Sequence, residues 1–530
     1  MAVPGTARNR YPCDRRHSGQ PLPSTLRCID CGSLRSLWHK RAMLHRLTPM
    51  CSMFVLCACS VTPATNIGGA AASTGGSGGI GGSETLVAGA TNGGVAGISL
   101  GGSTGAGGSN ITTGGSASVG GANATGGSSV SAAGGADVAG HPGPPYSFPQ
   151  NNRSSNCIYP GAAHSQDART TYGTWKSKLV TGDGAGGYQR VLRPDNENNA
   201  TNTTVSEGIG YGMILAVVMD EQSLFDNLWR YSQLHTNGNG LMIWLIDSSG
   251  NPGVEDATAN PPKLAGGSAT DADEDIAWAL AMAAQKWGGH GTLTTDYSAL
   301  AKAQIARIWN SEVDHSGVDL INAGDSWGTT FAWNPSYFAP NEYRLFAKLD
   351  TANAAAWTRI IDKGYSVLAA SQNTSTGLFP AWTDASGTPS APWTGAPTNY
   401  QYDAARIPFR IGLDYCDNGD SRAKTVLART SNFFSNLGAS AIVDGYSLTG
   451  TGTPENTSPA GVQSALFVGA AGVGAMSNAT YQPFVNAVYT RLVTQPDNLM
   501  LPKSYYFNLS WKVFSLLMMS GNLFDYTLHP

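Results

Sequence analysis

The sequence predicts an all-α domain in which amphipathic outer helices surround a set of buried inner helices. Apolar residues recur at i, i+3, i+4 and i+7 in several segments of residues 146–530, which is the spacing of one helix face. Residues 211–219 (YGMILAVVM) are apolar on every side, which predicts a helix in the interior. Strand signals are few and short, as at residues 445–448. A toroid of paired helices and a solenoid both satisfy this pattern, and no internal repeat favours the solenoid.

Composition excludes several classes of protein. The 530 residues carry a formal net charge of −4, and only 13% of them are charged. This balance excludes strong attraction to nucleic acids or anionic membranes as the main function. The 13 Trp and 20 Tyr exclude a wholly disordered chain. No run of about 18 apolar residues predicts a spanning helix.

Residues 1–59 form an N-terminal extension that ends in an export signal. The CIDC motif at residues 28–31 is a single CxxC, which does not predict a zinc site. Met43 is a candidate start, followed by a basic stretch, a short apolar run and Cys59. This segment resembles a bacterial lipoprotein signal with a lipid anchor at Cys59, and an ordinary secretory signal cleaved near Ala58 is the alternative. We therefore expect an exported protein, either a cell-surface or outer-membrane lipoprotein or a secreted protein.

Residues 60–145 are expected to form a disordered linker. Between residues 60 and 140 the chain is Gly, Ser, Thr and Ala-rich, with Glu84 and Asp137 as its charged residues and no Phe, Trp or Tyr. Such a segment cannot bury enough apolar surface to offset the entropy lost on ordering. The folded domain is therefore expected over residues 146–530, where the sequence leaves open whether Cys157 and Cys416 pair.

Within that domain, five apolar stripes predict helices. They are Ile276, Leu280, Ala283 and Trp287; Tyr297, Ala301, Ile305 and Ile308; Trp357, Ile361, Tyr365 and Leu368; Leu427, Thr430, Phe434 and Leu437; and Leu509, Val513, Leu516 and Ser520. Trp287 and Trp357 lie on these stripes, so we expect them in the core. Gly521 is expected to end the last helix. The long polar connections at residues 248–268 and 383–400 are expected to carry functional groups.

Glu207, in TVSEGIGYGM, begins the first acidic site. We expect Ser206 to cap the buried helix and Glu207 to lie in its first turn. The three glycines that alternate after Glu207 leave room for another group to approach. Glu207 could alternatively serve only the helix dipole. However, such a residue should head an amphipathic helix rather than one that is apolar all round.

The second acidic site is SATDADEDIAW, at the start of a predicted helix. Thr270 is expected to cap this helix, and Asp271, Asp275 and Trp278 share the face opposite its apolar stripe. A solvated acidic helix start is one alternative, and a calcium site is another. DADED lacks the glycine and the distal glutamate of an EF-hand loop, which argues against calcium.

The third acidic site is NYQYDAARIPFRIG. Asp403 precedes Arg406 by three residues, so a local ion pair on a helix is the simplest interpretation. Aromatic residues adjoin the pair, which argues against a purely solvated face.

Carboxylates beside Trp and Tyr predict a sugar site. Aromatic faces pack on the apolar faces of pyranose rings, and glycosidic hydrolysis needs one carboxylic acid and one carboxylate. ATDADEDIAWALAMAAQKW resembles the signature of glycoside hydrolase family 8. SEGIGYGM, NGLMIWLID, NPSYFAPNEYRLF and YDAARIPFR resemble its other blocks in the same order. The resemblance covers about residues 165–525 and implies an (α/α)6 barrel with an acidic cleft and an inverting mechanism.

The same resemblance implies a role for individual residues. Glu207 is the implied general acid, Asp403 the general base, and Asp271 the group that holds the distorted sugar. The implied substrate-binding residues are Trp244 and Trp327 as stacking platforms, with Tyr337, Tyr402 and Arg406 lining the central subsites. Tyr505 and Tyr506 are further candidates for lining the cleft. A helix N-terminus lowers the pKa of a carboxyl group, whereas a general acid must stay protonated near neutral pH. We therefore expect burial and the negative charge of Asp271 to raise the pKa of Glu207 again.

The predicted activity is that of an endo-β-1,4-glucanase of the cellulase type. The YDAxR form of the base motif resembles the cellulase and xylanase branches, so an endo-β-1,4-xylanase is the first alternative within the family. A chitosanase is a further alternative, although the chitosanases of this family usually place the base elsewhere, on a Glu. A non-catalytic glycan-binding surface lipoprotein is the alternative from another class, and a role in making the cell's own cellulose is a third. The expected partner is a β-1,4-linked glycan, without nucleic acid. The chemistry requires no metal ion or organic cofactor, and we expect a monomer.

Overall fold

The computed structural model describes residues 146–528 apart from residues 196–199, 260, 328–331, 394, 454–462 and 497–504. The predicted export signal, Cys59 and the linker lie outside the described residues. Among the helices of the described segments, none combines the length and the apolar character needed to cross a membrane.

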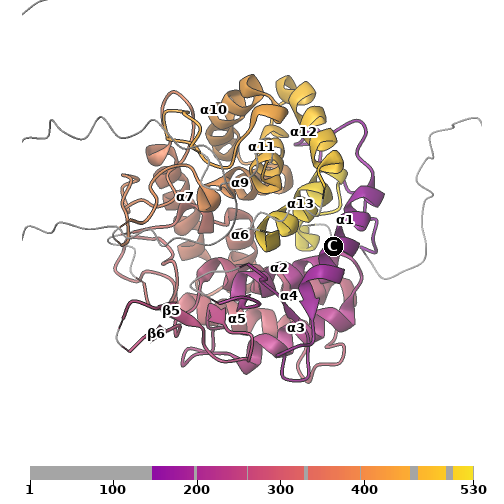
Figure 1. Cartoon of the computed structure of the whole chain (residues 1–530), viewed down its shortest axis with the longest axis vertical. Coiled ribbons are helices and arrows are strands. Elements are labelled where there is room, and N and C mark those ends of the chain that lie inside the picture. The colour runs from indigo at the N-terminus through magenta and orange to yellow at the C-terminus, as the bar shows by residue number, and fades with distance from the viewer. Residues whose placement is uncertain are drawn as a thin grey trace, which may run out of the picture. The chain divides into compact units, whose positions relative to one another are not determined.

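Helices of the described residues alternate along the chain between an outer and an inner position (Figure 1). The outer helices are α1 (Ser165–Leu179), α3 (Gln222–Leu234), α5 (Tyr297–Ser311), α7 (Ala354–Ser371), α10 (Ser421–Leu437) and α12 (Gln482–Thr494). The inner helices are α2 (Ser206–Val218), α4 (Thr270–Trp287), α6 (Pro340–Leu349), α9 (Ile407–Asn418), α11 (Ala465–Ala475) and α13 (Tyr505–Ser520).

The inner helices close into a ring. Each packs against the next in chain order, from α2 to α13. The ring closes where Trp511 and Phe514 of α13 pack edge-on against Tyr211 of α2, at centroid distances of 5.6 Å and 5.4 Å. This closure confirms the predicted (α/α)6 barrel and excludes the solenoid, whose terminal repeats would not meet.

Burial follows the apolar patterns of the sequence. In α2 every residue except Glu207 is buried, and α11 is buried throughout. The outer α10 buries Leu427 and Phe434 of its predicted stripe and leaves Leu437 exposed. Trp357 is fully buried, and Trp287 is partly buried against the same core, as expected for residues on apolar stripes.

Strands in the described residues are two or three residues long. They form three antiparallel pairs: β1 (Val180–Thr181) with β2 (Arg190–Val191), β3 (Thr204–Val205) with β4 (Leu245–Ile246), and β5 (Val254–Asp256) with β6 (Lys263–Leu264). The strand expected at residues 445–448 is wrong. Tyr446 makes only isolated bridges to Tyr400 and Gly452, because the chain turns back at Gly450, whose φ is 95°.

The helix ends correct two predictions. Ser206 and Thr270 lie one residue inside their helices, and the N-cap residues are Val205 and Ala269, neither of which caps through its side chain. The pairing of β3 with β4 fixes the approach to α2, where the Ser206 amide donates to the carbonyl of Trp244 at 2.9 Å. Gly521, with a φ of 78°, follows α13 as predicted.

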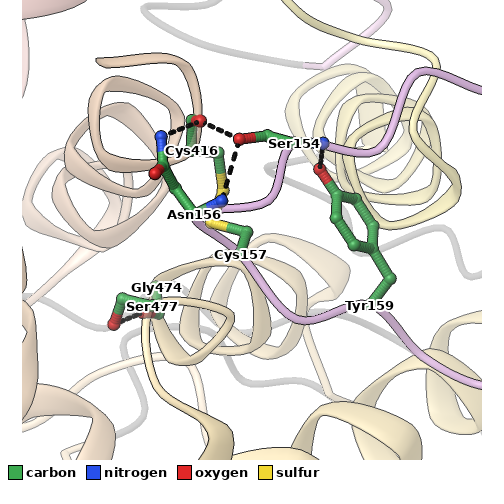
Figure 2. The surroundings of a disulfide bond; sticks show 7 residues. All are labelled: Ser154, Asn156, Cys157, Tyr159, Cys416, Gly474 and Ser477. Atoms are coloured by element: carbon green, nitrogen blue, oxygen red, sulfur yellow. Dashed lines mark hydrogen bonds between the residues drawn. A yellow bond between two sulfur atoms is a disulfide. The ribbon is translucent and has the colours of Figure 1, made fainter. Parts of the chain in front are cut away.

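Cys157 and Cys416 form a disulfide with a Cα–Cα distance of 5.2 Å (Figure 2). Cys416 lies on the inner helix α9, and Cys157 lies in the segment that precedes α1. The Asn156 side chain donates to the Cys416 carbonyl at 3.1 Å. The disulfide therefore fastens the N-terminal segment of the described domain to the helical ring.

Candidate active site

Glu207 lies in the first turn of α2, with its side chain 20% exposed. Its Oε2 accepts hydrogen bonds from Nη1 of Arg406 at 3.1 Å and from the Tyr211 hydroxyl at 3.2 Å. Its Oε1 accepts one from the Tyr506 hydroxyl of α13, also at 3.2 Å. A Cβ at Gly208 would lie 3.0 Å from that hydroxyl, so the glycine allows Tyr506 to approach.

Asp271 lies in the first turn of the neighbouring helix α4 and is 2% exposed. Its Oδ2 accepts a hydrogen bond from Nη1 of Arg406 at 2.6 Å, the same nitrogen that contacts Glu207. The helices approach closely because α2 has a glycine at position 210, where a Cβ would lie 2.9 Å from the Cβ of Asp275. The alternating glycines thus bring the two acidic helix starts together.

Asp403 reaches the same guanidinium from a third element. It lies in the short helix α8 (Tyr402–Ala405), and Arg406 joins α8 to α9. Nη2 of Arg406 donates to Oδ1 of Asp403 at 3.2 Å and to the hydroxyl of Ser336 at 2.8 Å. The predicted local ion pair exists, but it is one part of a buried cluster in which a 1% exposed arginine binds three carboxylates. We call Glu207, Asp271, Asp403 and Arg406 the upper ion cluster.

The two proposed catalytic carboxylates therefore lie close together without touching. Glu207 and Asp403 bind different terminal nitrogens of one guanidinium. Because that group is small and planar, the bound carboxylate oxygens are no more than about 9 Å apart. This limit is compatible with the separation of about 6.5–9.5 Å that leaves room for a water in an inverting enzyme.

Burial raises the pKa of Glu207 to about 7. The positive charge of Arg406 opposes this rise, while the carboxylates of Asp271 and Asp403 add to it. Burial also raises the pKa of Asp403, again against the effect of Arg406. Glu207 is thus a carboxyl group that can hold a proton near neutral pH.

Of the predicted aromatic residues, Tyr337 and Tyr506 contact the side chains of this cluster, and the others lie at different depths in the domain. Tyr337, in the 3-10 helix η1 (Pro335–Tyr337), packs its ring against the Arg406 guanidinium at 5.1 Å. Trp244 is partly buried, and its backbone carbonyl holds the residue before Glu207. Tyr402 donates to Asp444 at 3.2 Å, and Trp327 is exposed. Of the further candidates, Tyr506 contacts Glu207, whereas Tyr505 is buried with its amide donating to Asp195.

The structure corrects one alternative for α4. Its acidic start is not a solvated face, because Asp271, Asp273, Glu274 and Asp275 are all at most 3% exposed. Below the upper cluster, Arg410 binds Asp275 at 3.1 Å and Glu342 at 2.9 Å, and we call these three residues the lower ion cluster.

Sequence reasoning missed the lower cluster. Asp275 and Arg410 each lie four residues after a member of the upper cluster, so helical spacing was the available signal. Within the described segments, no group of three or more His, Cys, Asp or Glu side chains is arranged to hold a metal ion.

Comparisons with known proteins identify the family of the chain. The family "Glycosyl hydrolases family 8" matches residues 147–521. Endoglucanase C of Ruminiclostridium cellulolyticum is 38% identical over 72% of this chain and 79% of its own length. Endoglucanase A of Acetivibrio thermocellus is 39% identical over 66% of this chain and 68% of its own length. The solved structure of a beta-1,3-1,4-glucanase from Paenibacillus sp. X4 superposes with a TM-score of 0.62 at 29% identity, covering 72% of this chain and all of the other.

Proposed function

This chain belongs to glycosyl hydrolase family 8, and from that premise we propose that it is an inverting endo-β-1,4-glucanase in which Glu207 is the acid and Asp403 the base. The observation that carries the proposal is the upper ion cluster, in which one buried guanidinium binds three carboxylates. The relatives named endoglucanases support a β-1,4-glucan as the substrate.

The reaction needs two proton transfers. Protonated Glu207 donates its proton to the glycosidic oxygen as the bond to the anomeric carbon breaks, and the bonding electrons stay on that oxygen. Asp403 accepts a proton from a water whose oxygen bonds to the anomeric carbon from the opposite face. The anomeric configuration is thereby inverted, and one water is consumed for each bond cleaved.

Arg406 stabilises the charge that develops on Glu207. Its Nη1 already contacts Oε2, so the carboxylate left after proton donation has a charge-assisted hydrogen bond in place. Among the described residues, the side-chain group that hydrogen-bonds to Oε1 is the Tyr506 hydroxyl, which can serve as donor or acceptor. We therefore assign the transferred proton to Oε1 of Glu207.

A carboxylate and several aromatic side chains have different roles in substrate binding. Asp271 is proposed to hold the distorted sugar at the cleavage point, close to both catalytic groups through Arg406. Trp244 and Trp327 are proposed as stacking platforms, with Tyr337 and Tyr402 beside the central subsites. Flat rings suit this role because they bury the apolar face of a pyranose at little entropic cost.

A substrate panel tests the proposal. Reducing-end release is measured on carboxymethylcellulose, lichenan, xylan and chitosan, and we expect the largest kcat/KM on a β-glucan. Glu207→Gln should lose at least about a thousandfold in kcat while it still binds cello-oligosaccharides in calorimetry. Glu221→Gln is the matched control, because Glu221 pairs with Lys176 at 2.7 Å on the outside of the domain. Glu207→Gln with near-normal turnover, or a parent active only on xylan or chitosan, would contradict the proposal.

We also propose that the protein is exported as a monomer and anchored through lipidated Cys59. The Cys157–Cys416 disulfide supports export, because such bonds persist in oxidising compartments. Membrane fractionation tests the anchor: Cys59→Ser should move the protein from the membrane to the soluble fraction. An unchanged distribution would contradict lipidation.

A further inference from the structure

Three tryptophans gather beside the proposed active site. Trp327 is 38% exposed and Trp393 is 50% exposed, and they are the aromatic members among the exposed large hydrophobic residues of the described segments. Trp382 packs against both of them and is 5% exposed. Exposed aromatic side chains that cluster in this way commonly mark a ligand-binding surface.

The three rings pack against one another and form one aromatic unit. Trp327 lies nearly parallel to Trp382, with centroids 5.9 Å apart and planes at 19°, so one face of Trp327 is covered by its neighbour. Trp393 stands at 67° to Trp327 and at 70° to Trp382, with centroid distances of 6.0 Å and 5.7 Å. The buried Trp382 therefore supports both exposed rings through direct ring contacts.

This aromatic unit is continuous with the catalytic centre. Trp382 shares a small apolar cluster with Ala323, Ala332 and Ala381, and Tyr337 packs against that cluster. Tyr337 in turn packs its ring against the guanidinium of Arg406, which binds the proposed acid and base. An unbroken row of side chains therefore connects the exposed tryptophans with the carboxylates.

The loops that carry the tryptophans are also fixed to the catalytic elements. The carbonyl of Ala323 accepts a hydrogen bond at 3.2 Å from the amide of Thr270, the residue before Asp271. The amide of Thr383 donates to the carbonyl of Trp333 at 2.9 Å, just before η1. The position of the aromatic unit relative to the proposed acid and base is thus set by backbone hydrogen bonds.

We propose that Trp393, acting with Trp327 on the anchor Trp382, forms an outer subsite that binds a glucosyl unit of the β-glucan distant from the bond being cleaved. This inference rests on the proposed function. A glycan chain is the occupant because the unit continues the row of groups proposed to bind that chain, and because flat, rigid rings match the apolar face of a pyranose. The long connection at residues 383–400, which carries Trp393, thereby acquires a role in substrate length preference.

The test compares long and short substrates. For Trp393→Ala we expect kcat/KM on cellohexaose and on soluble β-glucan to fall about five- to tenfold through KM, the loss expected when one stacked face is removed. On the shortest cello-oligosaccharide that the parent cleaves, the loss should stay below about twofold, since this substrate does not reach the outer subsite. When Trp393→Ala is combined with Glu207→Gln, the Kd for cellohexaose should rise about five- to tenfold, as the KM does in the active enzyme.

Three further variants separate stacking from general damage. Trp393→Phe keeps a flat ring and should recover most of the affinity. Trp393→Leu keeps apolar bulk without a flat face and should behave like the alanine variant. Leu437→Ala is the matched truncation of an exposed apolar side chain on α10, and it should change kcat/KM on neither the long nor the short substrate.

The outcomes distinguish the two proposals. Equal losses on long and short substrates, or no loss on either, would refute the outer subsite while the parent's glucanase activity stands. Full activity of the leucine variant would likewise refute stacking. A parent that neither cleaves nor binds any β-1,4-glucan would overturn the proposed function and the subsite together.

Discussion

Asp271→Asn tests how a carboxyl group at a helix start remains protonated. Oδ2 of Asp271 and Oε2 of Glu207 bind the same nitrogen of Arg406, at 2.6 Å and 3.1 Å. The two oxygens therefore lie within about 6 Å, where two negative charges repel by about 3 kcal/mol at an effective dielectric constant of 20. Solvent at the 20% exposed side chain of Glu207 weakens this repulsion, so the effect is on the order of 1–3 kcal/mol. Asparagine keeps the shape and removes the charge.

The expected result is a shift of the whole pH–rate profile. The charge of Asp271 raises the pKa of both Glu207 and Asp403, after the larger effect of burial. The basic limb reports loss of the Glu207 proton and the acidic limb reports protonation of Asp403. Without the charge of Asp271, both limbs should move to lower pH, the basic limb by about one to two pH units. Glu207 should keep a pKa above its ordinary 4.5, because it remains buried.

The assay is kcat/KM on soluble β-glucan from about pH 4 to pH 9, which covers both limbs. Asp273→Asn is the matched control on the same turn of α4. Burial raises the pKa of Asp273 well above its ordinary value, and its Oδ1 accepts a hydrogen bond from Gln304 at 2.8 Å rather than from Arg406, which binds Glu207. Its limbs should not move. If Asp271→Asn lowers the rate but leaves both limbs in place, Asp271 acts on the sugar alone and the electrostatic reasoning fails.

Three other changes have defined outcomes. Replacing Cys157 and Cys416 by Ser should lower the free energy of unfolding by about 3–5 kcal/mol in urea, because the disulfide joins residues 259 positions apart; an unchanged midpoint would contradict this. Gly210→Ala should cost about 1–3 kcal/mol and depress kcat, since its Cβ would lie 2.9 Å from that of Asp275 and separate α2 from α4; a parental melting temperature would argue against that packing. Arg406→Lys keeps the charge but loses the two terminal nitrogens that bind different carboxylates, so kcat should fall about a hundredfold or more; a loss below about tenfold would show that charge alone suffices.

The fold was predictable where one sequence property decides burial. The run at residues 211–219 is apolar all round, and a helix of that kind has no solvent-facing side, so its inner position follows directly. Helix ends were less predictable. Ser206 has the chemistry of a cap, but pairing of β3 with β4 fixes the backbone one residue earlier and α2 begins at Ser206 itself. The capping preference of Ser206 was therefore overridden by the pairing of two strands that lie far apart in the sequence.

The candidate site was predictable in its members but not in their arrangement. Each acidic motif is short and local, so Glu207, Asp271 and Asp403 could each be singled out. Their meeting at Arg406 depends on α2, α4 and α8 converging across the ring, which no local pattern encodes. Trp393 could not be found for a similar reason, because it occurs in a long polar connection and gains meaning only beside Trp327 and Trp382.

The charge balance of the upper ion cluster favours Glu207 as the residue that carries the proton in the proposed reaction. Three carboxylates share one guanidinium in a poorly solvated place, so protonation of one of them is the least costly state. Of the three carboxylates, Asp271 makes the shortest contact with Arg406, at 2.6 Å. Glu207 binds Arg406 at 3.1 Å, and its other hydrogen bonds within the described residues come from the Tyr211 and Tyr506 hydroxyls. In the proposed reaction Glu207 loses one proton and Asp403 gains one, so the total charge of the cluster is the same before and after cleavage. The free energy needed to bury the excess negative charge therefore lowers the stability of the fold, and it does not add to the activation free energy of each turnover.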